Sequence, residues 1–188
     1  SRGLGDVYKR QQYTLGKPIS FKGNGLHSGI PVTITMRPAP AGSGIIFRRI
    51  DLTGAPEVPA KSEFVTNTLR ATTLERGGAK VFTVEHILSA LFALRIDNCI
   101  LEMDAPEPPV ADGGALTFSQ MILEAGIMEL EEQTDILTLE TSVAVYEDNK
   151  FITALPYDGL RITFTSINPH PLLGTQMKDF TIDKETYI

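Results

Sequence analysis

The sequence of 188 residues predicts an α+β protein. Apolar and polar residues alternate along most of the chain, only two stretches have the spacing of an amphipathic helix, and the order runs strands, helix, strand, helix, strands. A sheet with one apolar face must bury that face against another element, so this order favours layers of sheet and helix.

The strands follow from the period-two pattern. In residues 31–38, three apolar side chains alternate with Thr33 and Thr35, as in a strand that is buried on one face. A Gly-rich turn at 23–29 precedes this strand, and residues 44–50 form the next one. Further strands are expected at 69–75, 79–83 and 98–104, with Arg76, Gly77 and Gly78 as the hairpin turn between the first two.

Two segments have helical spacing. Residues 83–96 carry apolar side chains three and four positions apart, and Thr83 is a suitable N-cap residue. A second helix is expected from about residue 118 to 125, with Thr117 as N-cap and Gly126 in the usual terminating position.

The chain divides into three parts by composition. Residues 1–11 show no periodicity and are interpreted as a translated adapter outside the fold, so the first domain is expected at 12–130. The acidic run 131–135 is interpreted as a linker that opens a second domain, 131–188. Its strand patterns are not followed by a helix, so this second domain is expected to be truncated; the patterns lie at 136–147, 150–156 and 160–168.

Composition excludes several classes of protein. The net charge of −6 and the pI near 5.1 provide no basic footprint for nucleic acid. Cys99 is the only cysteine, so we expect no intrachain disulfide, a buried thiol and a reducing compartment. The apolar runs are shorter than the roughly 20 residues that span a bilayer, and no signal peptide is recognisable. We therefore expect a cytoplasmic protein without a transmembrane segment.

Glu85 and His86 are the most suggestive pair of polar residues. Both fall in the first turn of the predicted helix, where free N–H groups favour a carboxylate, so an ordinary helix start is one interpretation. The other is half of a metal-dependent active site, since side chains about 100° apart on a helix can flank one metal ion. The sequence has two further histidines, His27 and His170, but no HExxH motif and no local set of three zinc ligands.

Two loops leave alternatives open. The loop GNGLHSG at 23–29 is either a hairpin connection or a nest of N–H groups for an anion. The loop APEPPVADGG at 105–114 is predicted to be a rigid connection with Asp112 and Gly113 at its turn. No GxSxG motif supports a serine hydrolase.

Taken together, these segments resemble one family, the UDP-3-O-acyl-N-acetylglucosamine deacetylases of lipid A biosynthesis. The resemblance spans about residues 12–188, and its most specific parts are TVEHILSAL and the pair IDN and APEPPVADG. Other matching segments, in the family's order, are GNGLHSG, PVTITMRPAP, GIIFRR and NPHPLLGTQ.

The resemblance implies a zinc-dependent amidohydrolase that removes the N-acetyl group of a small-molecule substrate, an acylated UDP-N-acetylglucosamine. It implies two similar α+β domains, each a two-layer sandwich of a sheet against two helices, with the active site between them. By motif match, His86 would be a Zn²⁺ ligand and Glu85 the general base that takes a proton from the zinc-bound water. The segment Leu69, Arg70 and Ala71 would line the zinc site, and His27 would lie near the substrate.

The chain also departs from the family pattern. The other two zinc ligands of the family, a histidine and an aspartate four residues apart, are absent from this sequence, and His170 is interpreted as structural. We therefore expect an N-terminal fragment, monomeric and with negligible activity by itself. The alternative is a non-catalytic binding module that uses the Gly-rich loop 23–29.

Overall fold

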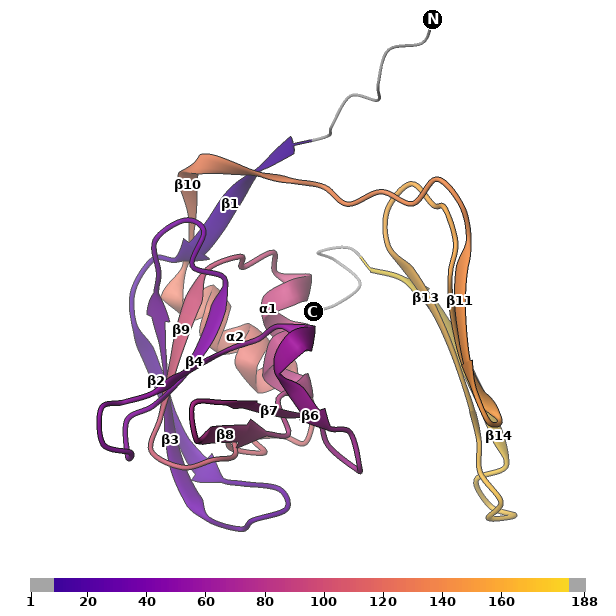
Figure 1. Cartoon of the computed structure of the whole chain (residues 1–188), viewed down its shortest axis with the longest axis horizontal. Coiled ribbons are helices and arrows are strands. Elements are labelled where there is room, and N and C mark those ends of the chain that lie inside the picture. The colour runs from indigo at the N-terminus through magenta and orange to yellow at the C-terminus, as the bar shows by residue number, and fades with distance from the viewer. Residues whose placement is uncertain (1–8, 183–188) are drawn as a thin grey trace, which may run out of the picture. The chain divides into compact units, whose positions relative to one another are not determined.

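The structure, a computed structural model, describes residues 9–182 and has an α+β fold (Figure 1). The chain forms two compact units, Lys9–Thr134 and a second that contains the residues from Asp135 onward. Both helices belong to the first unit, and no helix among residues 9–182 has the length and apolar character needed to cross a membrane. The elements of the first unit are β1 (Lys9–Leu15), β2 (Ile19–Asn24), β3 (Pro31–Pro38), β4 (Ile45–Arg49), β5 (Glu57–Pro59), the 3-10 helix η1 (Ser62–Phe64), β6 (Val65–Asn67), β7 (Thr73–Arg76), β8 (Ala79–Phe82), α1 (Glu85–Ala93), β9 (Cys99–Met103), α2 (Leu116–Ala125) and β10 (Ile127–Asp135).

A five-stranded mixed sheet with the order β2-β3-β9-β4-β5 forms the centre of this unit. β3 pairs with β9 in antiparallel register, which places Ile34 opposite Met103 and Met36 opposite Leu101 on the buried face. On the other face Thr35 lies opposite Glu102. The alternation predicted for residues 31–38 is therefore confirmed, with the apolar set inside because successive side chains of a strand point to opposite faces.

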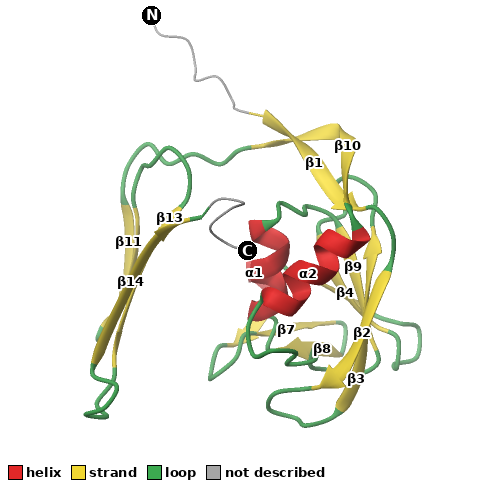
Figure 2. Cartoon of the chain, turned by 180° about the vertical axis from the view of Figure 1, so that it is seen from behind, coloured by secondary structure: helices red, strands yellow, loops and turns green. Residues whose placement is uncertain are grey.

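The helices share one core with the sheets. α1 packs against α2, and both lie on the same side of the central sheet in Figures 1 and 2. Ile87, Leu91, Phe118 and Ile122 of the helices are each at most 1% exposed. The side chains of the sheets in this core are Leu15, Ile34, Met36, Phe47, Val58, Leu74, Ala79, Val81, Cys99, Leu101 and Met103.

Both helices form where the apolar spacing predicts them, but neither is capped by the expected threonine. α1 begins at Glu85 after Val84, and Thr83 has a φ of +57° and donates its hydroxyl to Glu107 (Oγ1 to Oε1, 2.7 Å). An N-cap threonine needs an extended backbone and a hydroxyl that accepts from the helix, so the assignment of Thr83 was wrong. α2 begins one residue before Thr117, whose backbone N–H donates to Asp112 (Oδ1, 3.2 Å).

The predicted hairpin is present, but its first strand is shorter than expected. β7 and β8 pair in antiparallel register around Gly77 and Gly78, whose φ values of +57° and +80° fit a tight turn between strands. Residues 69–71 precede the strand as bends, because Arg70 adopts a φ of +62° that is incompatible with a strand. β6 is the third strand of this small sheet.

Residues 9–11 and 131–135 belong to strands, although the sequence pattern placed them outside the fold. β1 pairs with β10, and the Gln11 side chain donates to the carbonyl of Leu130 (Nε2 to O, 3.0 Å). Such pairing of chain segments more than a hundred residues apart has no local sequence signal. Residues 1–8, which complete the expected adapter, lie outside the described residues.

The motif Ile96-Asp97-Asn98 holds β1 in place. Asp97 accepts two hydrogen bonds from the Arg10 guanidinium (2.6 and 2.8 Å) and one from the backbone N–H of Tyr13 (2.9 Å). Asn98, which is 1% exposed, accepts from the N–H of Gly44 (Oδ1, 3.0 Å). The motif thus fixes β1 and the entry to β4.

The second unit consists of two antiparallel hairpins, β11 (Val143–Glu147) with β12 (Lys150–Ala154) and β13 (Arg161–Ile167) with β14 (Thr175–Thr181). Ile162 pairs with Phe180 on one face of β13–β14, and Arg161 donates to Asp179 on the other (Nη2 to Oδ2, 2.6 Å). Each hairpin exposes large apolar side chains, among them Val145, Tyr146, Phe151, Ile152, Phe164 and Met177.

Candidate functional site

Glu85 and His86 are the first two residues of α1. Glu85 is exposed and His86 is half-buried, so both side chains are accessible to a ligand. No side chain caps this helix, and the free N–H groups of its first turn favour a nearby negative charge. The pair therefore provides a carboxylate and an imidazole at one accessible point of the first unit.

The carboxylate of Glu85 is tied to the segment that precedes β7. The backbone N–H of Thr72 donates to Oε1 of Glu85. Arg70, two residues earlier, adopts the left-handed backbone conformation that is rare for residues other than glycine. This hydrogen bond brings the predicted substrate segment 69–71 next to the start of α1.

A shallow depression of about 230 Å³ brings together all four residues predicted to contact a substrate. His27 comes from the loop after β2, whereas Leu69, Arg70 and Ala71 come from the bend before β7. Its other lining residues are Thr73, Lys80 and Phe82. Glu85 and His86 are not among the lining residues, but Thr72 connects Glu85 to this wall of the depression.

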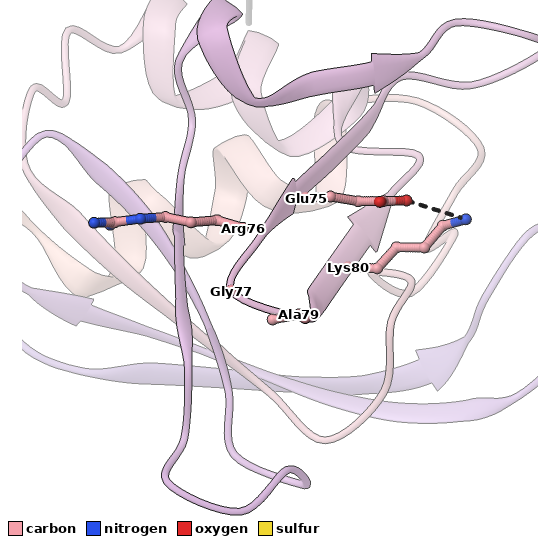
Figure 3. Close-up of a pocket in the computed structure, with 6 residues that line it drawn as sticks. Glu75, Arg76, Gly77, Ala79 and Lys80 are labelled. Atoms are coloured by element: carbon pink, nitrogen blue, oxygen red, sulfur yellow. Dashed lines mark ion pairs between the residues drawn. The ribbon is translucent and has the colours of Figure 1, made fainter.

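The charge around this depression is mainly positive. Arg70 and Lys80 both line it, and Lys80 lies 5.8 Å from the centre of the Phe82 ring. Lys80 also pairs with Glu75 across the β7–β8 hairpin (3.6 Å), as Figure 3 shows. An exposed pair at this distance leaves most of the positive charge available to an anion.

A second, open depression of about 430 Å³ lies at the tip of the β7–β8 hairpin (Figure 3). It is lined by residues 75–80, and it includes none of the site residues that the sequence predicted. Its ionisable side chains are Glu75, Arg76 and Lys80, and Arg76 lies over the ring of Phe64 (5.4 Å to the centroid). None of its lining residues is a histidine, cysteine, serine or threonine, so this surface offers no hydroxyl or thiol nucleophile and no imidazole base.

The Gly-rich loop 23–29 connects β2 to β3, which confirms the hairpin interpretation of this loop. Its N–H groups also surround an anion, but the anion is a carboxylate of the chain itself. The backbone N–H groups of His27 and Ser28 donate to Glu107 (3.0 and 2.8 Å). No sequence pattern indicated Glu107, because an acid in a Pro-rich loop carries no signal of burial.

His170 makes only local contacts, as expected for a structural residue. It lies in the loop between β13 and β14, where its Nδ1 accepts from the N–H of Leu172 (3.3 Å). Its own N–H donates to the side chain of Asn168 (Oδ1, 2.8 Å). These bonds shape a turn of the second unit.

The described residues do not form a complete metal site by themselves. Within residues 9–182 no three His, Cys, Asp or Glu side chains are grouped as they would be around a metal ion. A catalytic zinc ion usually has three protein ligands and one open position. His86 could supply one such ligand, with Glu85 beside it, so the described residues by themselves hold at most part of such a centre.

The fold and the site define an α+β protein with an accessible carboxylate–imidazole pair beside a cationic depression. The chain belongs to the LpxC family, because the family model described as UDP-3-O-acyl N-acetylglycosamine deacetylase matches residues 12–188.

Curated relatives agree with this assignment. The bifunctional enzyme LpxC/FabZ of Chlorobaculum tepidum is 44% identical over 177 residues, which is 93% of this chain and 38% of that protein. The UDP-3-O-acyl-N-acetylglucosamine deacetylases of Legionella pneumophila strain Corby and Hahella chejuensis are 42% and 41% identical over 173 residues, which is 92% of this chain and 57% of each relative. The chain thus spans about half the length of the curated relatives it matches.

Proposed function

We propose that these residues are the N-terminal part of a zinc-dependent deacetylase. The reaction is hydrolysis of the N-acetyl group of UDP-3-O-acyl-N-acetylglucosamine, the committed step of lipid A biosynthesis. The observation that carries this proposal is the position of Glu85 and His86 together at the start of α1, beside the depression, in a chain of the LpxC family.

Hydrolysis of an amide requires a base for the attacking water and a proton for the departing nitrogen. Glu85 is the base: its exposed carboxylate takes a proton from the water that attacks the acetyl carbonyl. The proton returns to the nitrogen as the C–N bond breaks, so acetate and a free amine result. The N–H of Thr72 holds Oε1 of this carboxylate, which leaves the other oxygen to accept the proton. Fixing the base in this way lowers the cost of orienting it for each turnover.

His86 would hold zinc through one imidazole nitrogen. When bound, zinc would polarise the acetyl carbonyl and acidify water. The remaining protein ligands would come from residues outside these 188, since the described part of the chain offers no group of three candidate ligands. We therefore propose that this polypeptide alone has negligible deacetylase activity.

The depression lined by His27, Leu69, Arg70 and Ala71 would contact the substrate. Its positive charge suits the diphosphate of a UDP-sugar, because Arg and Lys bind phosphate oxygens through charge-assisted hydrogen bonds. Leu69 is 83% exposed and so offers an apolar contact for a part of the substrate that is not charged.

The two units would correspond to two similar domains, each a two-layer sandwich of a sheet and two helices. On this proposal the first domain ends with β10, and the strands from β11 onward are the opening strands of the second domain. The exposed apolar residues of β11 to β14 support it, because amphipathic strands need a partner layer to bury one face.

The alternative is a non-catalytic module that binds a phosphate or a partner through the loop 23–29. This function is disfavoured, because the N–H groups of His27 and Ser28 already donate to the Glu107 carboxylate. A second anion there would meet a buried negative charge.

We further propose a monomeric cytoplasmic enzyme with a small-molecule substrate and without a nucleic-acid partner. The acidic net charge supports the last point. The free, buried thiol of Cys99 supports a reducing compartment.

The test compares zinc content and acetate release for the full-length protein and its His86→Ala variant. We expect His86→Ala to lose zinc and turnover, whereas the control His170→Ala keeps both. The 188-residue chain should release no acetate. Deacetylation at an undiminished rate by His86→Ala, or by the 188-residue chain, would contradict the proposal, and unchanged zinc and binding in both variants would favour the binding module.

A further inference from the structure

We propose that Glu107 is a positioning residue of the candidate site. Its carboxylate holds the His27 loop and Thr83, two residues before α1, in one fixed arrangement, and so sets where His27 lies relative to Glu85 and His86. This inference rests on the proposed function, because it assigns Glu107 a task in that same reaction.

The first observation is that Glu107 is buried and its oxygens are used by two separate segments. The side chain is 1% exposed. Oε1 accepts from the hydroxyl of Thr83 (2.7 Å) and the N–H of His27 (3.0 Å), and Oε2 accepts from the N–H of Ser28 (2.8 Å). A buried carboxylate is tolerated only when donors satisfy its oxygens, and here three donors from two segments do so.

The carboxylate stays ionised in this environment. Burial raises the pKa of Glu107, but the hydrogen bonds from Ser28, His27 and Thr83 together lower it by more than burial raises it. The pKa of Glu107 therefore lies below its ordinary value. An ionised carboxylate has no proton to donate and accepts at both oxygens, so it can hold N–H and O–H donors from different directions at once. A neutral side chain of the same shape cannot do this.

The backbone around Glu107 joins the same two segments. The N–H of Phe82, at the end of β8, donates to the carbonyl of Pro106 (3.0 Å). The N–H of Val110 donates to the carbonyl of Asn24 (2.8 Å). Residues 106–110 therefore lie between the end of β8 and the loop 23–29, and Glu107 occupies the middle of this connection.

The local backbone is shaped to permit these contacts. Thr83 is β-branched and adopts a φ of +57°, which is a genuine outlier for such a residue and persists only where the surroundings fix it. A Cβ at Gly25 would lie 2.3 Å from Oε2 of Glu107, so the loop can approach the carboxylate only with glycine there. Both features concern the same carboxylate.

The contacts lead directly to the candidate site. Thr83 stands two residues before Glu85, and the side chain of His27 lines the depression together with Phe82. Removing the carboxylate would free the backbone of the loop and of residue 83 together. A displacement of about 1 Å in such groups can reduce turnover about 100-fold.

The test uses Glu107→Gln and Thr83→Val, with Glu102→Gln and Thr35→Val as matched controls. Glutamine keeps the shape and loses the charge, and valine removes one hydroxyl while it keeps the β-branched shape. Glu102 is a carboxylate of β9 that pairs with Arg37 and Arg48, away from the loop.

In the 188-residue chain, the backbone amide hydrogens of His27 and Ser28 should exchange about tenfold faster in Glu107→Gln than in the wild type. Their exchange rates should be unchanged in the controls. In the full-length zinc-loaded enzyme, at a temperature where each variant is folded, kcat/KM should fall about 10- to 100-fold in Glu107→Gln. Thr83→Val should also lower it, and the double variant should lose less than the product of the two effects, because both changes disturb the same group of hydrogen bonds around the Glu107 side chain.

A purely stabilising role of Glu107 would leave kcat and KM of the folded enzyme unchanged, and that result would overturn the inference. Unchanged exchange at His27 and Ser28 would overturn it as well. Absence of deacetylation by the wild-type full-length protein would be a different failure: it would remove the proposed function, and the positioning role with it.

Discussion

The backbone N–H of Thr72 donates to the carboxylate of Glu85, which joins the bend before β7 to the first residue of α1. The bond crosses thirteen positions of the sequence and connects two segments that share no local pattern. It places the segment with Leu69, Arg70 and Ala71 within reach of the acid–histidine pair.

Glu85→Gln should lower kcat of the full-length enzyme by about 100- to 10,000-fold, the range that general-base catalysis contributes. The amide oxygen of glutamine can still accept from Thr72, and Glu85 is exposed, so the fold should be unaffected. The measurement is acetate release under saturating substrate. Glu75→Gln is the matched control, since Glu75 is an exposed acid of the nearby hairpin. A normal rate in Glu85→Gln would rule out Glu85 as the base.

Asp97→Ala should destabilise the first unit by about 1.5–3 kcal/mol, the usual loss for hydrogen bonds to a charged group. The change removes the acceptor for the Arg10 guanidinium and for the N–H of Tyr13. Urea denaturation of the 188-residue chain, followed by circular dichroism, measures it. Glu124→Ala on the exposed face of α2 serves as the control. Equal stability of the two variants would show that β1 is held by other contacts.

The stabilising effect of Glu107 should disappear in acid. The pKa of Glu107 is lower in the folded protein than its ordinary value of 4.5, so its contribution is present above about pH 4.5 and is lost as the pH falls through the folded pKa. The free energy of unfolding should therefore differ between wild type and Glu107→Gln at pH 7, and the difference should shrink below pH 4.5. Urea denaturation across this range tests it. For Glu124→Gln the difference should stay flat, and a flat difference for Glu107→Gln would contradict the assignment.

Cys99 should resist thiol reagents while the protein is folded. Its side chain is fully buried, and burial raises the pKa of the thiol to about 12, so almost no thiolate is present at pH 8. Labelling with a disulfide reagent should proceed only after unfolding in urea. A Ser20→Cys variant, whose new thiol would lie on the exposed part of β2, provides the reactive control. Rapid labelling of native Cys99 would show that the core opens locally.

The prediction of the fold succeeded where one strand or helix carries its own periodic pattern. β3, β4, β9, the β7–β8 hairpin and both helices follow alternation, helical spacing or a Gly-Gly turn. It failed for β1 and β10, because the acidic run 131–135 pairs with β1 as a strand and does not form an unpaired linker. A strand at the edge of a fold has little apolar patterning, and its partner is chosen by tertiary contacts.

The candidate site divides in the same way. The sequence by itself determined the position of Glu85 and His86 at a helix start, four of the seven residues that line the depression, and the family to which the chain belongs. Only the tertiary structure decided that the Thr83 hydroxyl donates to Glu107 and does not cap the helix. The same holds for the hydrogen bonds that the Glu107 carboxylate accepts from the N–H groups of His27 and Ser28 in the loop 23–29. The reason is physical: periodicity reports which face of one element is buried, whereas a buried carboxylate depends on donors that distant segments bring to it.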